Sequence, residues 1–159
     1  MKALVIYYSL EGNTKMIADA IKEEIDCDIA RLIPRKDIPK KGFLKYFFGG
    51  KQVLLRQKPK LKSFNNNFEA YDLIIFGSPV WAGSYVPAFN TLFSQANIIN
   101  KKIALFCTYR GNEGKIFKRF NNKLIGNEII GQIGFVSPLE NNAVKNSNKA
   151  KQWIRQFIK

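Results

Sequence analysis

The sequence predicts an α/β fold in which a doubly wound parallel sheet carries helices on both faces. Five short apolar segments are spaced along the 159 residues, at 2–8, 27–33, 71–77, 102–108 and 128–136. The first, third and fourth are rich in isoleucine, valine, leucine and phenylalanine with little alternation, which is typical of strands covered on both faces. A helical stretch follows each segment, and five such units in a row favour parallel strands with right-handed crossovers.

The helices that we expect after the first and last strands have clear apolar stripes. The first begins at Asn13 and places Ile17, Ala20, Ile21 and Ile25 on one side. The last has apolar residues at three- and four-residue spacing, namely Val144, Ala150, Trp153, Ile154, Phe157 and Ile158.

Residues 42–57 also carry aromatic and leucine side chains at helical intervals, around Gly49-Gly50. We interpret this segment first as the second crossover helix, packed on the sheet with its lysines in solvent. Two alternatives stay open: a lid over a ligand site, or a surface for an acidic partner or a membrane lipid.

The charge of the chain is strongly positive and unevenly distributed. The formal net charge is +14, and ten Lys/Arg against Asp37 alone give residues 34–63 a charge of +9. Such a field favours acidic proteins, nucleic acids or anionic membranes as partners, but we find no recognisable nucleic-acid-binding module. The chain has no histidine, which excludes Ser-His and Cys-His catalytic arrangements and most zinc sites. We expect no metal site.

The remaining composition suggests a cytoplasmic protein with one domain over residues 1–159. Strand-like residues begin by position 3, which leaves no room for a secretory signal. The longest uncharged stretch, 73–100, is interrupted by Pro79 and Pro87, so we expect no transmembrane segment. Cys27 and Cys107 lie far apart in strand-like segments, and we expect buried, unreactive thiols.

Three loops follow strands and should meet at one edge of the sheet. They are residues 9–14, 78–84 and 108–114. In open α/β sheets, ligands bind beyond the carboxyl ends of the strands, where the strand order changes direction. We therefore expect these loops to form the functional site.

The first loop offers hydroxyls, a side-chain amide and backbone N–H groups at a helix N-terminus, which suits a phosphate. The same residues would also suit the start of any helix. The loop resembles the FMN-phosphate loop of the flavodoxin family, Thr/Ser-x-Thr-Gly-x-Thr, at Ser9, Gly12 and Thr14. The resemblance implies a phosphate site formed by Ser9, Leu10, Glu11, Gly12, Asn13 and Thr14. Because Glu11 replaces a hydroxyl residue, we expect only its backbone N–H to face the ligand, with its carboxylate in solvent.

The second loop contains Pro79, Trp81 and Gly83 in the pattern Pro-x-Trp-x-Gly. It resembles the isoalloxazine-binding loop of flavodoxin-like oxidoreductases, which implies ring contacts from Ser78, Pro79, Val80, Trp81, Ala82 and Gly83. Trp81 is the expected stacking residue, although it could instead pack a helix onto the sheet. Electron-transferring flavodoxins have glycine directly after the aromatic residue. Since alanine resists positive φ, we expect Ala82 to disfavour the backbone change on which those carriers depend.

The third loop resembles the loop over the flavin pyrimidine, which implies contacts from Thr108, Tyr109, Arg110 and Gly111. Tyr109 could be a second stacking face and Arg110 a cation near the ring. Glycine, asparagine and threonine also occur in such loops for turn formation alone.

The resemblance covers nearly the whole chain and implies a flavodoxin-like, five-stranded sheet of order 2-1-3-4-5 with FMN as cofactor. The flavin would then supply the chemistry, so no side chain is expected to be catalytic. The favoured function is an oxidoreductase that passes electrons from NAD(P)H to a quinone or similar acceptor. The alternatives are a one-electron carrier that docks on an acidic redox partner and a flavin-free basic binding module.

Overall fold

The computed structural model describes residues 1–39, 42, 44–64 and 67–158. Its elements are β1 (Ala3–Tyr7), α1 (Asn13–Glu24), β2 (Cys27–Arg31), α2 (Leu44–Leu54), the 3-10 helix η1 (Phe68–Ala70), β3 (Leu73–Pro79), α3 (Ala88–Gln95), β4 (Lys102–Tyr109), α4 (Ile116–Lys123), β5 (Glu128–Val136) and α5 (Ala143–Arg155). Each predicted strand is present, with small shifts at the ends.

The five strands form one sheet in the predicted order, β2-β1-β3-β4-β5, and every neighbouring pair is parallel. The chain runs from β1 outward to β2 and then returns to β3 on the other side of β1. The strand order therefore changes direction between β1 and β3, which is where a ligand site is expected in such a sheet.

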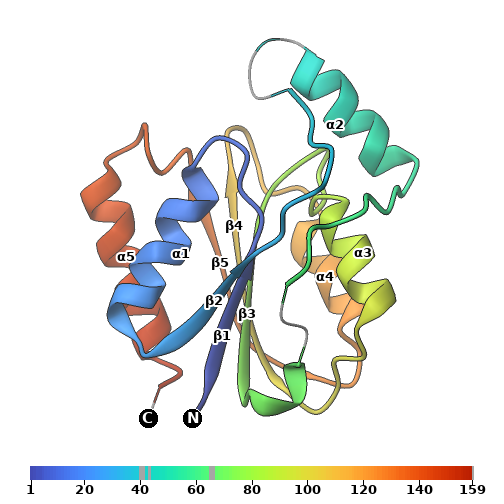
Figure 1. Ribbon diagram of the computed structural model, residues 1–159. Helices are drawn as coiled ribbons and strands as arrows, with labels where there is room; N and C mark the ends of the chain where they lie inside the picture. The colour runs from blue at the N-terminus through green and yellow to red at the C-terminus, as the bar shows by residue number, and fades with distance from the viewer. Residues whose placement is uncertain (40–41, 43, 65–66, 159) are drawn as a thin grey trace.

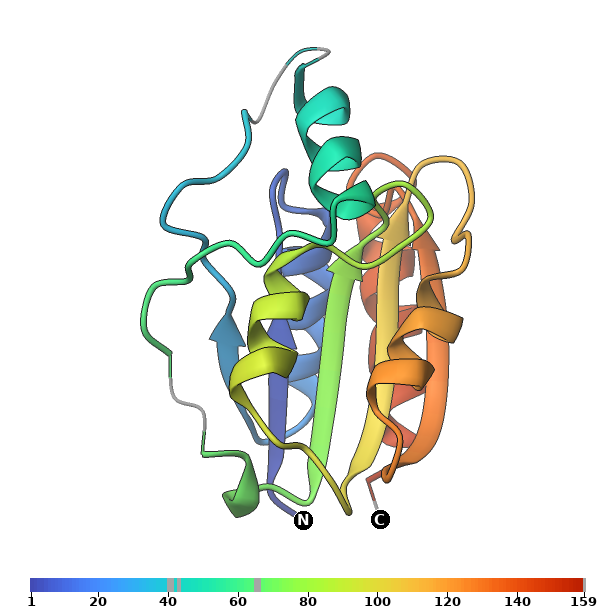
Figure 2. The same cartoon turned by 90° about the vertical axis from the view of Figure 1, so that its right-hand side faces the viewer.

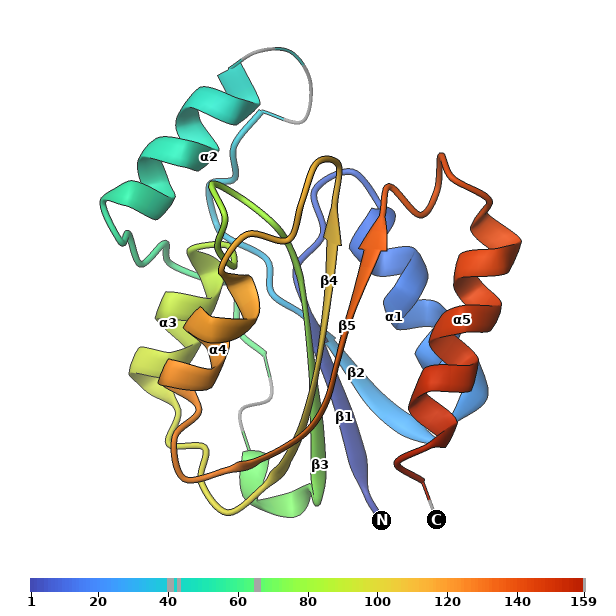
Figure 3. The ribbon, with the colours of Figure 1, turned by 180° about the vertical axis from the view of Figure 1, so that it is seen from behind.

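Helices cover both faces, with α1 and α5 on one side and α3 and α4 on the other (Figures 1 and 3). Successive β1 residues point to opposite faces, so Val5 joins the apolar cluster under α1 and α5, and Ile6 joins the cluster under α3 and α4. This explains the continuous apolar run of the strand, because neither face is open to water.

The second crossover differs from our first interpretation, because α2 does not pack on the sheet. It lies beyond the carboxyl ends of the strands, at the end of the molecule opposite both termini (Figures 1 and 2). Within α2 only Gly49 and Val53 are buried. The prediction of a sheet-packed helix is therefore wrong, and the alternative of a helix above the ligand site fits the structure.

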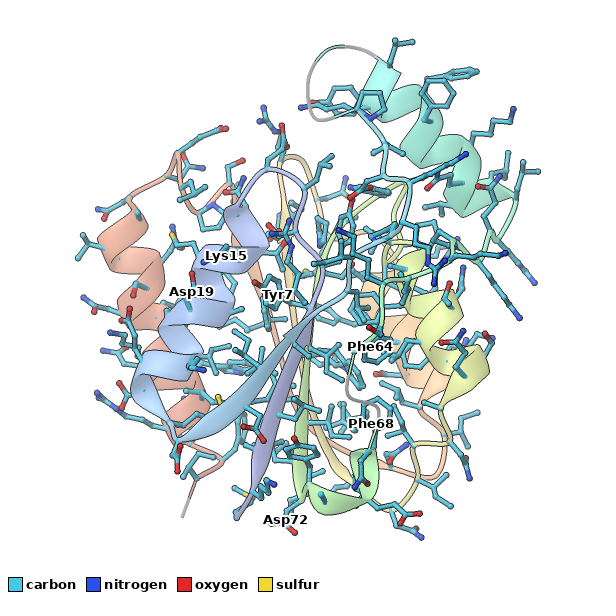
Figure 4. All side chains as sticks on the ribbon, in the orientation of Figure 1. Tyr7, Lys15, Asp19, Phe64, Phe68 and Asp72 are labelled. Carbon is cyan, nitrogen blue, oxygen red and sulfur yellow. The ribbon has the colours of Figure 1, made fainter. Side chains whose placement is uncertain are left out.

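The segment after α2 covers the sheet face that a crossover helix would have covered. Phe64 and Phe68, labelled in Figure 4, come from this segment, and both pack against the cluster under α3 and α4. Because these aromatic side chains already shield the sheet, α2 is not needed there.

Candidate functional site

A cavity of about 390 Å³ is lined by residues of the loops at the carboxyl ends of the strands and by residues of α2. The three loops expected to converge do line it together. Its lining residues are Leu10, Glu11, Asn13, Ile38, Lys45, Tyr46, Gly49, Gly50, Val80, Trp81, Ala82, Gly83, Thr108, Tyr109, Arg110, Gly111, Asn112 and Ser137. The volume is within the range usual for sites of cofactor-sized ligands.

Five of the predicted site residues do not line the cavity but support the loops that do: Ser9, Gly12, Thr14, Ser78 and Pro79. Ser78 is buried, and its hydroxyl donates to the Pro79 carbonyl and accepts from the Val86 N–H. These bonds fix the path of the chain as it leaves β3 toward the aromatic loop.

The first loop brings the N-terminus of α1 to the cavity. Gly12 precedes the helix with φ of 100°, and none of the described side chains caps this helix end. The Ser9 hydroxyl oxygen accepts the Gly12 N–H at 3.1 Å, which holds the loop in its tight curve. An uncapped helix N-terminus carries unpaired N–H groups and the positive end of the helix dipole, so this end of the cavity suits an anion.

Thr14 faces the interior at the start of α1. Its hydroxyl lies 2.8 Å from the hydroxyl of Thr108, which comes from the end of β4, and both residues are buried. The pair joins the first and third loops directly. Either hydroxyl could be the donor of this contact, and since a hydroxyl has one proton to give, Thr14 can donate to a ligand oxygen when Thr108 is the donor between them.

Glu11 is exposed, as expected, but its carboxylate is also paired with a cation from α2. Its Oε1 accepts a hydrogen bond from Lys45 Nζ of α2 at 2.5 Å, and Arg110 Nη2 lies 4.0 Å away. The hydrogen bond to Glu11 raises the pKa of Lys45 above its ordinary value. The carboxylate therefore ties α2 to the first loop.

Arg110 is also paired on its other side. Its Nη2 donates to Glu140 Oε1 at 3.0 Å, beyond β5. The two cations at the cavity mouth, Lys45 and Arg110, thus face two carboxylates, Glu11 and Glu140. Arg110 is near the predicted ring site, but its charge is largely compensated.

The aromatic loop ends in a two-residue turn. Trp81 and Ser84 exchange both main-chain hydrogen bonds, at 2.9 Å each, and the residues between them, Ala82 and Gly83, have φ of 47° and 69°. Two positive φ values are characteristic of a type I′ turn. Ala82 therefore adopts the positive φ that alanine resists, because the turn requires that conformation at both central positions.

Contacts with the third loop hold this turn in place. The Lys115 N–H donates to the Gly83 carbonyl at 2.9 Å. A Cβ atom at Gly114 would lie 2.5 Å from the Gly83 Cα, so the two loops approach at a distance that only glycine permits. The second and third loops therefore form a single wall of the cavity.

Trp81 is half-buried and lies between the sheet and α2. Its ring packs edge to face with Tyr8, with centroids 5.3 Å apart, and a Cβ atom at Gly49 would lie 3.3 Å from its Cε3. Burial and a hydrogen bond to Asp37 raise the pKa of Tyr8, which keeps its hydroxyl a neutral donor. Trp81 thus has packing partners and also lines the cavity; stacking on a flavin stays a prediction.

Tyr109, at the end of β4, also lines the cavity. A Cβ atom at Gly134 of β5 would lie 2.8 Å from its ring, and its carbonyl accepts the Ser137 N–H at 2.8 Å. Burial raises the pKa of the phenol. Tyr109 is thus held against β5 while lining the cavity.

The sequence prediction missed seven lining residues: Ile38, Lys45, Tyr46, Gly49, Gly50, Asn112 and Ser137. Two signals could have found some of them. Ser137 directly follows β5, whose carboxyl end is at the same edge as the others. A glycine within an aromatic helix indicates a close approach of the backbone to another group, and here Gly49 approaches Trp81.

The arrangement fits FMN by its own features. The uncapped end of α1 suits the phosphate, and Trp81 and Tyr109, which both line the cavity, offer aromatic surface for a flat ring. These two features lie at adjoining parts of one cavity, as a mononucleotide with a planar ring requires.

Comparisons with known proteins agree with this chemistry. Residues 1–119 match the family model described as NADPH-dependent FMN reductase. The flavodoxin-like domain-containing protein BilS of Clostridioides difficile (strain CD3) is 30% identical over 141 residues, which are 89% of this chain and 61% of that protein. The chain thus spans less than two thirds of that relative.

Two solved structures illustrate the likeness. A flavoprotein from Lactobacillus acidophilus NCFM, crystallised in complex with FMN, has a TM-score of 0.73 and 27% identity, covering 89% of this chain and 98% of that one. Oxidised flavodoxin 1 from Bacillus cereus has a TM-score of 0.55 and 16% identity, covering 99% and 97%, and shows a likeness of fold alone. The family match extends over most of the chain, and the protein therefore belongs to the NADPH-dependent FMN reductase family, with a flavodoxin-like fold and FMN as its cofactor.

Proposed function

We propose that this oxidoreductase takes electrons from NAD(P)H and passes them to a quinone or a similar small acceptor. The observation that carries the proposal is one cavity that joins an uncapped helix N-terminus to aromatic walls, at the change in strand order. The family match supports a nicotinamide as the electron donor. A cytoplasmic location, expected from the sequence, stays a prediction.

In this proposal the first loop holds the phosphate of FMN. The N–H groups of the first turn of α1, at Asn13 and Thr14, and the Thr14 hydroxyl would bind phosphate oxygens. Ser9 has a supporting part, since its hydroxyl already accepts the Gly12 N–H. Leu10 and Glu11 would contribute backbone, because the Glu11 carboxylate is engaged with Lys45.

The second and third loops would border the ring. Trp81 and Tyr109 offer aromatic faces, and residues 108–111 would place backbone N–H groups at the polar edge. Bound FMN supplies the hydride and electron chemistry, while the chain supplies binding, orientation and exclusion of water. The apposition of α2 to Trp81 supports a covering role for this helix over the ring site.

The positive charge of the chain supports an anionic electron donor. With a net charge of +14, the protein attracts a dinucleotide phosphate from a distance, and this attraction weakens with salt. Lys45 and Arg110 contribute less than their positions suggest, because both are ion-paired at the cavity mouth.

An anaerobic titration of the FMN-loaded protein tests the donor and the acceptor. NADPH or NADH should bleach the flavin absorbance, and a soluble quinone added next should restore it. Steady-state quinone reduction should require both the protein and FMN. Reduction by dithionite but by neither nicotinamide would contradict the proposal.

Thr14→Ala tests the phosphate site, with Thr14→Ser as the matched control that keeps the hydroxyl. A hydrogen bond to a charged group contributes about 1.5–3 kcal/mol, so Thr14→Ala should weaken FMN binding roughly ten- to a hundredfold. Riboflavin, which lacks the phosphate, should bind almost unchanged. Equal losses for both ligands would instead assign Thr14 to its hydrogen bond with Thr108.

A one-electron carrier is the second candidate, and the turn at Ala82 favours keeping it. Ala82 already holds a positive φ of 47°, so the turn overcomes the steric preference of alanine that counted against a carrier. Stopped-flow mixing separates the two functions: an enzyme is reduced by NADPH at a rate that supports its turnover. A carrier is reduced slowly by NADPH and rapidly by a partner flavoprotein.

A further inference from the structure

The apolar face of α2 points outward. Residues spaced three and four apart share one face of a helix, and here that face is exposed. Its members are Leu44, Phe47, Phe48, Leu54 and the following Leu55, with 55%, 55%, 39%, 82% and 56% of their surface exposed. The opposite face carries the buried Gly49 and Val53. The helix therefore has its apolar side toward solvent.

The contacts of the inner face set this orientation. Lys45 is tied to Glu11 by a hydrogen bond of 2.5 Å, and Gly49 lies against the ring of Trp81. A helix rotated to bury its apolar side would lose both contacts. We name the exposed residues Leu44, Phe47, Phe48, Leu54 and Leu55 the outer face of α2.

The charge around the outer face decides what can cover it. Residues 38–68 contain no aspartate or glutamate, and Lys51, Arg56 and Lys58 are all exposed in or just after α2. A second copy of this chain would bring the same positive charge against it and be repelled. The occupant is therefore anionic as well as able to accept apolar side chains.

The position of α2 favours a flat occupant over a protein groove. The helix forms the end of the molecule opposite the termini, and no other helix extends as far (Figures 1 and 3). A protruding helix of this kind can lay phenylalanine and leucine side chains into the boundary between headgroups and acyl chains, while nearby cations meet anionic headgroups. None of the described helices is long and apolar enough to cross a membrane, so the contact is peripheral.

We propose that the outer face of α2 docks this protein on an anionic membrane surface. The other side of the same helix lines the cavity through Lys45, Tyr46, Gly49 and Gly50, so docking brings the cavity mouth close to the lipid. If the proposed function holds, a lipid-soluble quinone could then reach the site from the membrane. The docking itself does not depend on the proposed function.

The test is cosedimentation of the full chain with vesicles of phosphatidylcholine alone or mixed with phosphatidylglycerol. Wild-type protein should bind the anionic vesicles at physiological ionic strength and the neutral ones weakly. The double variant Leu54→Gln, Leu55→Gln should bind at least roughly tenfold more weakly, since two leucine side chains no longer enter the apolar phase. Ile125→Gln, which changes a residue 78% exposed outside α2, is the matched control and should bind like wild type.

Charge is tested in the same assay. Lys51→Gln should weaken binding to anionic vesicles about fivefold, the effect expected for one cation near such a surface. Lys118→Gln, an exposed position on α4, should have little effect. Neither lysine lines the cavity, so FMN affinity should be unchanged and should report that the variants are folded.

Several outcomes would overturn the proposal. These are no binding to anionic vesicles, equal losses in the Ile125→Gln control, or binding that is insensitive to Leu54 and Leu55. Binding to polyglutamate with the same dependence on Leu54 and Leu55, but none to vesicles, would identify an acidic protein as the partner instead. Because the assay is run with and without FMN and needs no turnover, its outcome is separate from that of the NAD(P)H titration.

Discussion

Ala82→Gly should make the protein more stable, although alanine to glycine usually has the opposite effect. Ala82 is exposed and holds φ of 47° in the turn between Trp81 and Ser84. Its methyl group has little burial to lose. What the substitution changes is the cost of holding an L-residue in the left-handed region, which glycine adopts without steric penalty.

Two opposing contributions set the size of the effect. The left-handed conformation costs a residue with a Cβ about 1–2 kcal/mol. Glycine gains more freedom in the unfolded chain, which lowers stability by about 0.4–1 kcal/mol. The net stabilisation should be about 0.5–1 kcal/mol, or roughly 1–4 °C in Tm for a protein of this size.

The assay is urea unfolding and thermal melting of flavin-free protein, since bound FMN would shift the midpoint by mass action. The matched control is Ala70→Gly, another exposed alanine, which ends the 3-10 helix η1 where the backbone is right-handed. That control should lose about 0.4–1 kcal/mol. If both variants are destabilised alike, Ala82 does not occupy a left-handed turn and the reasoning is refuted.

Two further predictions use pairs of neighbouring or like residues. Gly49→Ala and Gly50→Ala gain the same helix propensity, about 1 kcal/mol. A Cβ atom at position 49, however, would lie 3.3 Å from Trp81 Cε3, whereas a Cβ atom at position 50 would have none of the described atoms within 4 Å. Thermal melts should therefore show a higher Tm for Gly50→Ala. For Gly49→Ala the Tm should rise less or fall, and the fluorescence of Trp81 should change. An equal rise in Tm for both variants would place α2 away from Trp81. Burial raises the pKa of Cys27 to about 11 and of Cys107 to about 12, so both thiols stay protonated below these values and become reactive only as pH rises toward them. Mass spectrometry after iodoacetamide treatment at neutral pH should find slow labelling, at half-buried Cys27 before buried Cys107, and the reverse order would contradict the packing of β4.

Sequence reasoning predicted the sheet well because the signal for a buried parallel strand is local. Residues such as Leu73 and Phe76 must be apolar on both sides of the strand, and that requirement shows in the segment itself. The meeting of the three loops then followed from topology, since the carboxyl ends of parallel strands share one edge. These two steps were enough to locate most of the cavity lining.

The features decided only by tertiary structure all depend on contacts between distant parts of the chain. The place of α2 follows from Phe68, which covers the sheet, and from the pairing of Lys45 with Glu11. The conformation of Ala82 is imposed by a turn whose carbonyl at Gly83 is held by the third loop. Local conformational propensity does not encode such contacts, because the residues that make them are distant in sequence and come together only when the chain folds.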